Sequence, residues 1–403
     1  MRDPSRVRVS GPLEPYALGF AAELSRVGYS RDSAAFQLRL MAHVSGWLAG
    51  EGLAASALTP VRVSAFSAAR RAAGFPTHLS VKALGPLLGY LHGIGVAPVA
   101  VERSWTAVDA LLERYRAYLL CERGLTAGTA RGYVDAVRPF LAGRVGAAGE
   151  LELWGLEAGD VLGFVLVQCP QRRRGSAKLI VTALRSLLGF LHVEGVLCRP
   201  LASVVPSVAG WRLAGLPQAL DGEQVSRLLG SCDRGTPVGR RDYAILTVLA
   251  RLGLRAGEVA GLELDDVDWR AGEILVRGKG NRAERLPLPA DVGEAVAGYL
   301  RAGRPSTAEG RTVFVRVKAP HRALTRGGVT QVVAAAGRRA GLASLSAHRL
   351  RHTVATELLR AGAPLAEIGQ LLRHRSALTT AIYAKVDRDA LRTIARAWPG
   401  GAA

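Results

Sequence analysis

The stretch of sequence that decides the fold reads Ser346-Ala347-His348-Arg349-Leu350-Arg351-His352. Its first residue can cap a helix, because a serine hydroxyl accepts a hydrogen bond from a backbone N–H of the first turn. On that helix His348 and Arg351 stand three residues apart and therefore share a face. The apolar positions of the segment form a separate stripe, made by Leu350, Val354 and Leu358. We therefore expect His348 and Arg351 to point away from the hydrophobic core.

The residues after this helix include further basic side chains and a tyrosine hydroxyl. The chain continues as Leu371-Leu372-Arg373-His374-Arg375-Ser376, and Tyr383 stands nine residues after His374. A lone tyrosine is usually an amphipathic packing residue. Here it has arginines and histidines near it in sequence, and no Gly-x-x-x-x-Gly-Lys loop is present to hold a nucleotide. Basic residues around a tyrosine hydroxyl suit a nucleophile that attacks a phosphodiester already present in DNA.

An arginine further upstream extends the pattern. Arg255 lies in Gly253-Leu254-Arg255-Ala256-Gly257-Glu258, three residues after a helix that we predict over Asp242–Leu252. A glycine-flanked arginine at a helix end is usually a surface residue. Glu258, three residues further on, could orient its guanidinium group.

A β-hairpin is predicted between this arginine and the histidine-containing helix. Glu273–Val276 and Glu284–Leu288 flank the turn Gly278-Lys279-Gly280-Asn281, which is a strong hairpin signal. Thr312–Val315 is a candidate third strand. Helical patterns then resume over Thr325–Arg339, Ala347–Ala361, Pro364–Leu372 and Ala377–Val386.

The first two hundred residues contain a weak internal repeat. Leu87-Leu88-Gly89-Tyr90-Leu91-His92 recurs as Leu187-Leu188-Gly189-Phe190-Leu191-His192, and Gly-Val follows each copy after two residues. The patterns predict a helical module over 1–100, a second helical domain over 104–198 and a further domain over 219–398. The linker between them, 199–218, contains Pro200, Pro206 and Pro217, which break regular structure.

Composition points to a polyanionic partner. The chain has 403 residues and a formal charge of +20, from 53 Lys and Arg against 33 Asp and Glu, which indicates nucleic acid. Residues 301–375 are the most basic part that we find, and their acidic residues are Glu309, Glu357 and Glu367. A second basic cluster, Arg172, Arg173, Arg174 and Lys178, is either a solvated loop or a set of contacts to DNA phosphates.

No metal site, cofactor or membrane segment is expected. The four cysteines form no C-x-x-C pair, and the apolar runs are too short to span a bilayer. His348 and His352 could suggest zinc, but neither a cysteine partner nor an H-E-x-x-H pattern accompanies them. We interpret the acidic group Asp265, Asp266 and Asp268 as turn and capping residues. A soluble cytoplasmic protein fits these features.

Taken in order, these elements resemble the catalytic signature of the tyrosine recombinases, the phage integrase family. The signature is an arginine in Gly-Leu-Arg-x-x-Glu, a hairpin lysine, His-x-x-Arg, and a histidine and tyrosine nine residues apart, and it spans 219–396. Residues 105–197 look like the core-binding domain of that family, and the first module looks like a second copy or an arm-like addition. The resemblance implies a mainly α fold with a small β-sheet (α+β), arranged as a C-shaped clamp around DNA.

The resemblance also assigns roles to residues. Tyr383 would attack the scissile phosphorus and form a 3′-phosphotyrosyl link. Arg255 and Arg351 would bind the non-bridging phosphate oxygens, because planar guanidinium groups suit phosphate, and His374 would add a third donor.

Two proton transfers complete the implied reaction. His348 is the expected acceptor of the tyrosine proton, and Lys279 the expected donor to the leaving 5′-oxygen. Arg277 and Arg282 are alternatives to Lys279, because the place of the lysine in this hairpin varies.

Two residues depart from the family pattern. Arg373 stands where glycine is common and Arg375 where a small polar residue is common, so the local backbone and phosphate contacts there are expected to differ. Neither change removes a catalytic atom.

The implied partners are double-stranded DNA and further copies of the chain, as a homotetramer on paired sites. The tail Asp387–Trp398 would dock on a neighbouring copy or pack on its own chain. An integrase or transposon recombinase is the preferred function. The alternatives are a Xer-like resolvase of chromosome or plasmid dimers, a non-catalytic DNA-binding protein and a relaxing topoisomerase.

Overall fold

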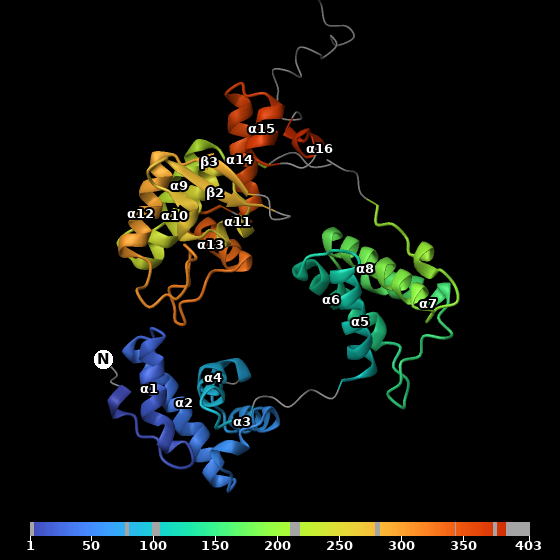
Figure 1. Cartoon of the computed structure of the whole chain (residues 1–403), viewed down its shortest axis with the longest axis vertical. Helices are drawn as coiled ribbons and strands as arrows, with labels where there is room; N and C mark the ends of the chain where they lie inside the picture. The colour runs from blue at the N-terminus through green and yellow to red at the C-terminus, as the bar shows by residue number, and fades with distance from the viewer. Residues whose placement is uncertain are drawn as a thin grey trace, which may run out of the picture. The chain divides into compact units, whose positions relative to one another are not determined.

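The computed structural model describes residues 4–76, 80–98, 105–209, 218–278, 283–342, 344–373 and 377–383. Two predicted catalytic residues, Lys279 and His374, lie outside these ranges. So do Arg282, Arg375 and the tail predicted over Asp387–Trp398. The chain divides into two compact units, Ala100–Ala214 and a larger one that combines Met1–Val99 with Gly215–Ala403. Each unit is described by itself below (Figure 1).

The smaller unit is helical. It contains α5 (Ala107–Cys121), α6 (Ala127–Ala142), α7 (Ala158–Gln168), α8 (Arg174–Val193) and a short 3-10 turn at Leu201–Val204. Thr126 caps α6, since its hydroxyl accepts from the Thr129 N–H at 3.4 Å. Leu201 and Val205, inside the predicted linker, are buried in the core of this unit. The linker is described only to residue 209, so the domain limits stay a prediction.

Helix α8 is the main core helix of this unit. It is long and apolar enough to cross a membrane by length and composition, but half of its apolar window is buried inside the protein. The buried face includes Leu184, Leu187 and Leu188, each without exposed surface. Burial against α5, α6 and the 3-10 turn at Leu201–Val204 accounts for the apolar character of α8.

The N-terminal part of the larger unit is also helical. It contains α1 (Ala17–Arg26), α2 (Arg31–Gly50), α3 (Pro60–Ala72) and α4 (Gly85–Gly93), with 3-10 turns at Pro4–Arg6, Glu14–Tyr16, Ala55–Ala57 and Val81–Leu84. Phe20, Met41 and Leu48 lie at the centre of its core.

The two segments that repeat in sequence end in the same backbone geometry. After α4 the Val96 N–H bonds to the Leu91 carbonyl at 2.9 Å, and after α8 the Val196 N–H bonds to the Leu191 carbonyl at 2.9 Å. Each turn contains a left-handed glycine, Gly95 with φ 71° and Gly195 with φ 72°. Glycine adopts this conformation without steric cost, so both helices end in the same C-cap.

The C-terminal part of the larger unit combines helices with a small sheet. Its helices are α9 (Gly222–Gly230), α10 (Pro237–Leu252), α11 (Ala256–Ala260), α12 (Ala290–Ala302), α13 (Arg326–Arg339), α14 (Ala347–Arg360), α15 (Leu365–Leu371) and α16 (Ala377–Thr380). A 3-10 turn at Leu264–Asp266 precedes the sheet. The strands β1 (Val267–Asp268), β2 (Glu273–Arg277) and β3 (Ala283–Pro287) pair antiparallel in the order β1-β2-β3.

Helix α10 holds this part together, because it packs against α12, α13 and α14. It begins five residues before the predicted start. Thr236 caps it by accepting from the Gly239 N–H at 3.0 Å, and Pro237 takes the first helical position, where its missing N–H costs nothing. Helices α14, α15 and α16 pack together at one end of this C-terminal part (Figure 1).

The predicted hairpin is confirmed, but the third strand of the sheet is not Thr312–Val315. Val267–Asp268 takes that place, and Thr312–Val315 makes isolated bridges to Glu263 and Ala323. The Val313 N–H donates to the Leu262 carbonyl, and the Phe314 carbonyl accepts from the Leu324 N–H. These backbone groups are therefore bonded to loop residues and do not pair with a strand of the sheet. Buried side chains hold the segment in the core.

Candidate active site

Arg351 lies inside the protein rather than on an outward face. Ser346 caps α14 as predicted, with its hydroxyl 3.3 Å from the Arg349 N–H, but Arg351 is only 2% exposed. The expectation that Arg351 points away from the core is therefore wrong. Its guanidinium donates to the Gly253 carbonyl at 2.7 Å and to the Leu372 carbonyl. Two carbonyls from distant segments thus give the buried cation the partners that burial requires.

The turn at Gly253 explains the glycine that precedes the first arginine. Gly253 ends α10 with φ 59°, in the left-handed region. A Cβ at this position would lie 2.8 Å from Leu372 Cδ2 and would force a shift. Glycine therefore allows the chain to turn back against Leu372 while its carbonyl faces Arg351. Burial and the nearby charge of Arg255 lower the pKa of Arg351 to about 10, so it stays charged at neutral pH.

Arg255 is anchored by a buried carboxylate. Its Nη1 donates to Glu258 Oε1 at 2.7 Å, and its backbone N–H donates to Glu258 Oε2 at 2.8 Å. The Arg255 side chain remains 44% exposed, whereas that of Glu258 is 5% exposed. Glu258 thus holds the arginine in place, as its spacing suggested, while leaving part of the guanidinium open to a ligand.

A second arginine shares the same carboxylate. Arg373 Nη2 lies 2.9 Å from Glu258 Oε2, and both side chains are 5% exposed. Burial pushes the pKa of Glu258 upward, but the Arg255 N–H bond and the charges of Arg373 and Arg255 outweigh it and hold that pKa below its usual range. Arg373 adopts a φ of 54°. This left-handed backbone is the physical reason why glycine suits the position.

Tyr383 is buried next to His352, to which the sequence assigned no catalytic role. Tyr383 is 1% exposed, and its Oη lies 2.9 Å from His352 Nδ1. The His348 ring packs against His352, with ring centroids 4.3 Å apart. The available sequence signal was spacing, because His348 and His352 stand four residues apart on one helix and therefore share a face.

Both histidines are neutral at neutral pH. Burial, His348 and Arg351 lower the pKa of His352 to about 4. Burial, Arg351 and Arg255 lower the pKa of His348. Burial raises the pKa of Tyr383, although Arg351 opposes this, so the phenol keeps its proton. The site therefore holds a protonated hydroxyl, two neutral imidazoles, the guanidinium groups of Arg255, Arg351 and Arg373, and the Glu258 carboxylate.

The model of the phage integrase family matches residues 218–389. Over 397 residues the chain is 43% identical to the protein named "Putative integrase/recombinase y4rA" of Sinorhizobium fredii, and the match covers 97% of this chain and 96% of that protein. The chain belongs to the phage integrase family, the tyrosine recombinases. This tyrosine recombinase is also 31% identical to the tyrosine recombinase XerD of Listeria monocytogenes, over 71% of this chain and 97% of that protein.

Solved structures of tyrosine recombinases share the fold. The XerH site-specific recombinase bound to palindromic difH substrate matches with a TM-score of 0.55 and 18% identity, over 73% of this chain and 97% of that chain. A lambda integrase dimer bound to a COC′ core site matches with a TM-score of 0.52 and 16% identity, over 73% and 98%. The mainly helical fold with a small sheet that the sequence predicts is confirmed.

The acidic residues near the sheet of this tyrosine recombinase serve the backbone. Asp266 Oδ2 accepts from the Glu263 N–H at 2.9 Å, and Asp268 Oδ1 accepts from the Arg270 and Ala271 N–H groups. The predicted capping and turn roles of Asp266 and Asp268 are confirmed, whereas the Asp265 carboxylate forms an ion pair with Arg311. Arg277, one alternative to Lys279, is paired with Asp266 at 2.5 Å. In the ranges that the structure describes, no three His, Cys, Asp or Glu side chains gather as metal ligands.

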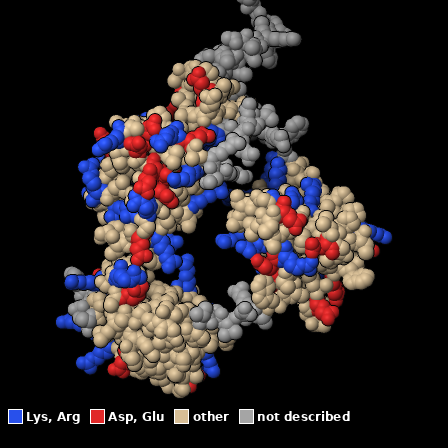
Figure 2. Space-filling view, in the orientation of Figure 1, with Lys and Arg blue, Asp and Glu red and all other residues tan. Residues whose placement is uncertain are grey.

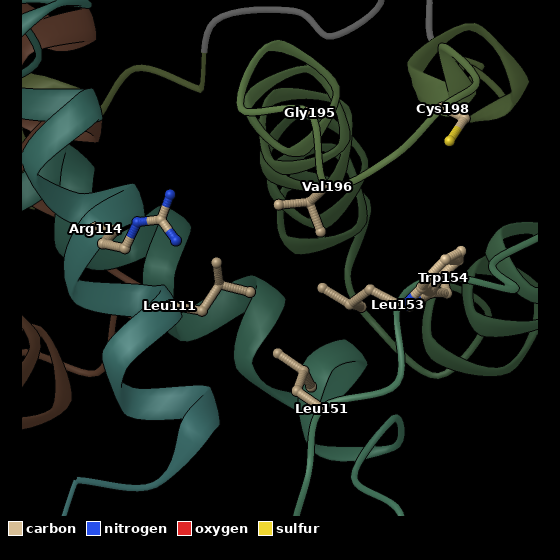
Figure 3. Close-up of a pocket in the computed structure, with 8 residues that line it drawn as sticks. All are labelled: Leu111, Arg114, Leu151, Leu153, Trp154, Gly195, Val196 and Cys198. Carbon is tan, nitrogen blue, oxygen red and sulfur yellow. The ribbon is translucent and has the colours of Figure 1, made fainter.

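A pocket of about 410 Å³ lies in the smaller unit (Figure 3). Its walls include Leu111, Leu153 and Val196, and Arg114 at its rim is paired with Glu194. None of the residues with a predicted catalytic role lines it. The basic cluster of the same unit, Arg172, Arg173, Arg174 and Lys178, is exposed around the start of α8.

Proposed function

We propose that this chain is a site-specific DNA recombinase that cuts and rejoins DNA through a 3′-phosphotyrosyl link to Tyr383, for the integration or transposition of mobile DNA. The observation that carries the proposal is the contact of the Tyr383 hydroxyl with a neutral histidine beside the buried cation Arg351. Nucleophile, proton acceptor and positive charge are the groups that transfer of a phosphoryl group to a hydroxyl requires.

Each described residue of the set has a place in this reaction. Arg255 offers the exposed part of its guanidinium, and Arg351 offers the N–H groups that its carbonyl partners leave free, to the non-bridging oxygens. Their charges stabilise the pentacoordinate phosphorus. Exchange of a phosphodiester for a phosphotyrosyl ester conserves the bond energy, so religation needs no ATP. Lys279 and His374 remain proposed members of the set, and a histidine of α14, His348 or His352, takes the proton of the tyrosine.

Charge supports DNA as the partner. Figure 2 shows Lys and Arg side chains over residues 105–209 and 218–373, whereas the visible face of residues 4–98 is largely uncharged. The exposed cluster at the start of α8 is a proposed phosphate contact. A clamp around duplex DNA, assembled as a tetramer in the cytoplasm, completes the proposal. A lambda integrase structure, solved as a tetramer bound to a Holliday junction, supports it by analogy.

The comparisons favour the integrase over the Xer-like alternative. The XerD relative is matched over nearly its whole length but covers 71% of this chain, whereas the integrase-type relative covers 97%. The additional length is shared with the integrase-type protein. A role confined to DNA binding would leave the arrangement of Arg255, Arg351 and Tyr383 without a use.

The test is a suicide substrate. Duplexes from the DNA that flanks the gene, nicked beside each candidate cleavage position, should trap the wild-type protein as a covalent adduct that survives denaturing electrophoresis. Tyr383→Phe should form no adduct. Tyr243→Phe, which removes a hydroxyl from another tyrosine of the same unit, is the matched control and should react like wild type. An adduct in Tyr383→Phe would contradict the assignment.

A further inference from the structure

His352 contacts both the other histidine and the tyrosine. Its Nδ1 lies 2.9 Å from Tyr383 Oη, and the centroids of these two rings are 5.5 Å apart. The centroid of the His348 ring is 4.3 Å from that of His352, at an interplanar angle of 64°. Of the two histidines, His352 is therefore the one within hydrogen-bond distance of the nucleophile.

The protonation states of this pair define the direction of the hydrogen bond. A neutral imidazole has one nitrogen that donates and one that accepts. Because Tyr383 keeps its proton, its hydroxyl donates to Nδ1 when His352 carries its own proton on Nε2. A neutral phenol is a weak nucleophile and needs a base at the moment of attack.

We propose that His352 is the base that takes the proton from Tyr383. In this proposal His348 positions His352 through their ring contact and does not take the proton of the tyrosine itself. This inference rests on the proposed function. As the bond between Tyr383 Oη and phosphorus forms, the phenolic proton passes to His352 Nδ1. The bond from phosphorus to the 5′-oxygen breaks, and that oxygen leaves as a hydroxyl after it receives a proton from a donor of the site. Religation runs the same transfers backwards.

Entry of the DNA would strengthen this base. Without DNA, burial and the neighbours His348 and Arg351 disfavour the charged form of His352. A phosphate bound by Arg255 and Arg351 adds negative charge next to the imidazole and offsets the arginine charges. His352 would therefore become basic when substrate is present, while Tyr383 stays protonated and unreactive in its absence.

His352→Asn is the direct test, with His348→Asn as the matched variant on the same helix. The asparagine amide offers a polar atom close to the position of Nδ1 but cannot act as a base. His352→Asn should bind DNA like wild type and form the covalent adduct about 100- to 10,000-fold more slowly, the usual range for loss of a general base. His348→Asn should slow adduct formation less. If His352→Asn does not bind DNA, His352→Gln takes its place.

A fluorinated nucleophile separates a base from a merely structural residue. We would place 3-fluorotyrosine, whose phenol is more acidic, at position 383 alone in the wild-type and His352→Asn proteins. A more acidic phenol needs less help from a base, so the substitution should accelerate adduct formation by a larger factor in His352→Asn than in wild type. An equal factor in both proteins, or a wild-type rate in His352→Asn, would overturn the inference.

The outcomes also separate this inference from the proposed function. A wild-type protein that forms an adduct through Tyr383, together with an unimpaired His352→Asn variant, removes the role of His352 and leaves the recombinase proposal intact. No adduct from wild type, or an adduct that persists in Tyr383→Phe, removes both.

Discussion

Replacing Arg373 by glycine should change the stability of the protein in two opposite ways: it relieves backbone strain and it removes a buried ion pair. The φ of 54° at Arg373 costs a residue with a Cβ about 1–2 kcal/mol, and glycine relieves that strain. The same replacement removes a guanidinium from a pair in which both side chains are 5% exposed. Loss of one partner from a buried ion pair costs about 3–5 kcal/mol. The net expectation is a destabilisation of about 1–4 kcal/mol.

Arg373→Ala isolates the backbone contribution. Alanine also removes the guanidinium, but it keeps a Cβ and therefore the strained conformation. It should be less stable than Arg373→Gly by about 1–2 kcal/mol. Both variants lose the Arg373 guanidinium, and in both Glu258 keeps two hydrogen bonds from Arg255. The cost of the lost ion pair therefore cancels when the two variants are compared.

Hydrogen exchange on the full chain measures this effect locally. Peptides from α10 and α14 should exchange faster in Arg373→Gly, by about tenfold for each 1.4 kcal/mol lost. Peptides from residues 105–209 should not change and serve as the internal standard. Arg360→Ala, at the exposed end of α14, is the control variant. If Arg373→Ala proves as stable as Arg373→Gly, the strain argument is wrong, and if both match wild type, the ion pair contributes nothing.

Three further results are expected. Because the pKa of Glu258 is held low, its stabilising contribution is complete above the unfolded-state pKa of about 4.3 and is lost as pH falls through the folded-state value. The unfolding free energy of Glu258→Gln should therefore fall less steeply in acid than that of wild type, and parallel curves would contradict this. Arg351→Lys, which loses the fork between two carbonyls, should bind DNA normally but form adduct about 100- to 1000-fold more slowly; an unchanged rate argues against a role in catalysis. Alanine at Arg172, Arg173 and Arg174 together should reduce the slope of log affinity against log salt by up to about 2.7, and an unchanged slope means that the cluster faces solvent.

The features of this protein that depend on local interactions could be predicted from its sequence. The helix that begins after Ser346, the hairpin between β2 and β3 and the capping role of Asp266 depend on partners within a few residues. Such contacts depend on residue type and spacing, which the sequence states directly. The order of arginine, histidines and tyrosine was sufficient to predict the family for the same reason, and the matches with known recombinases confirm it.

Only the tertiary structure decided which of these side chains are buried and which groups they contact. Arg373 and Glu258 are separated by 115 residues, and Arg351 and Gly253 by 98. The contact of His352 with Tyr383 spans 31 residues and three helices. Helical periodicity can state that Arg351 lies off the main apolar stripe, but it cannot state that two carbonyls from other segments cover that face. Contacts of this kind form when separate elements pack, so their geometry belongs to the fold rather than to any local pattern.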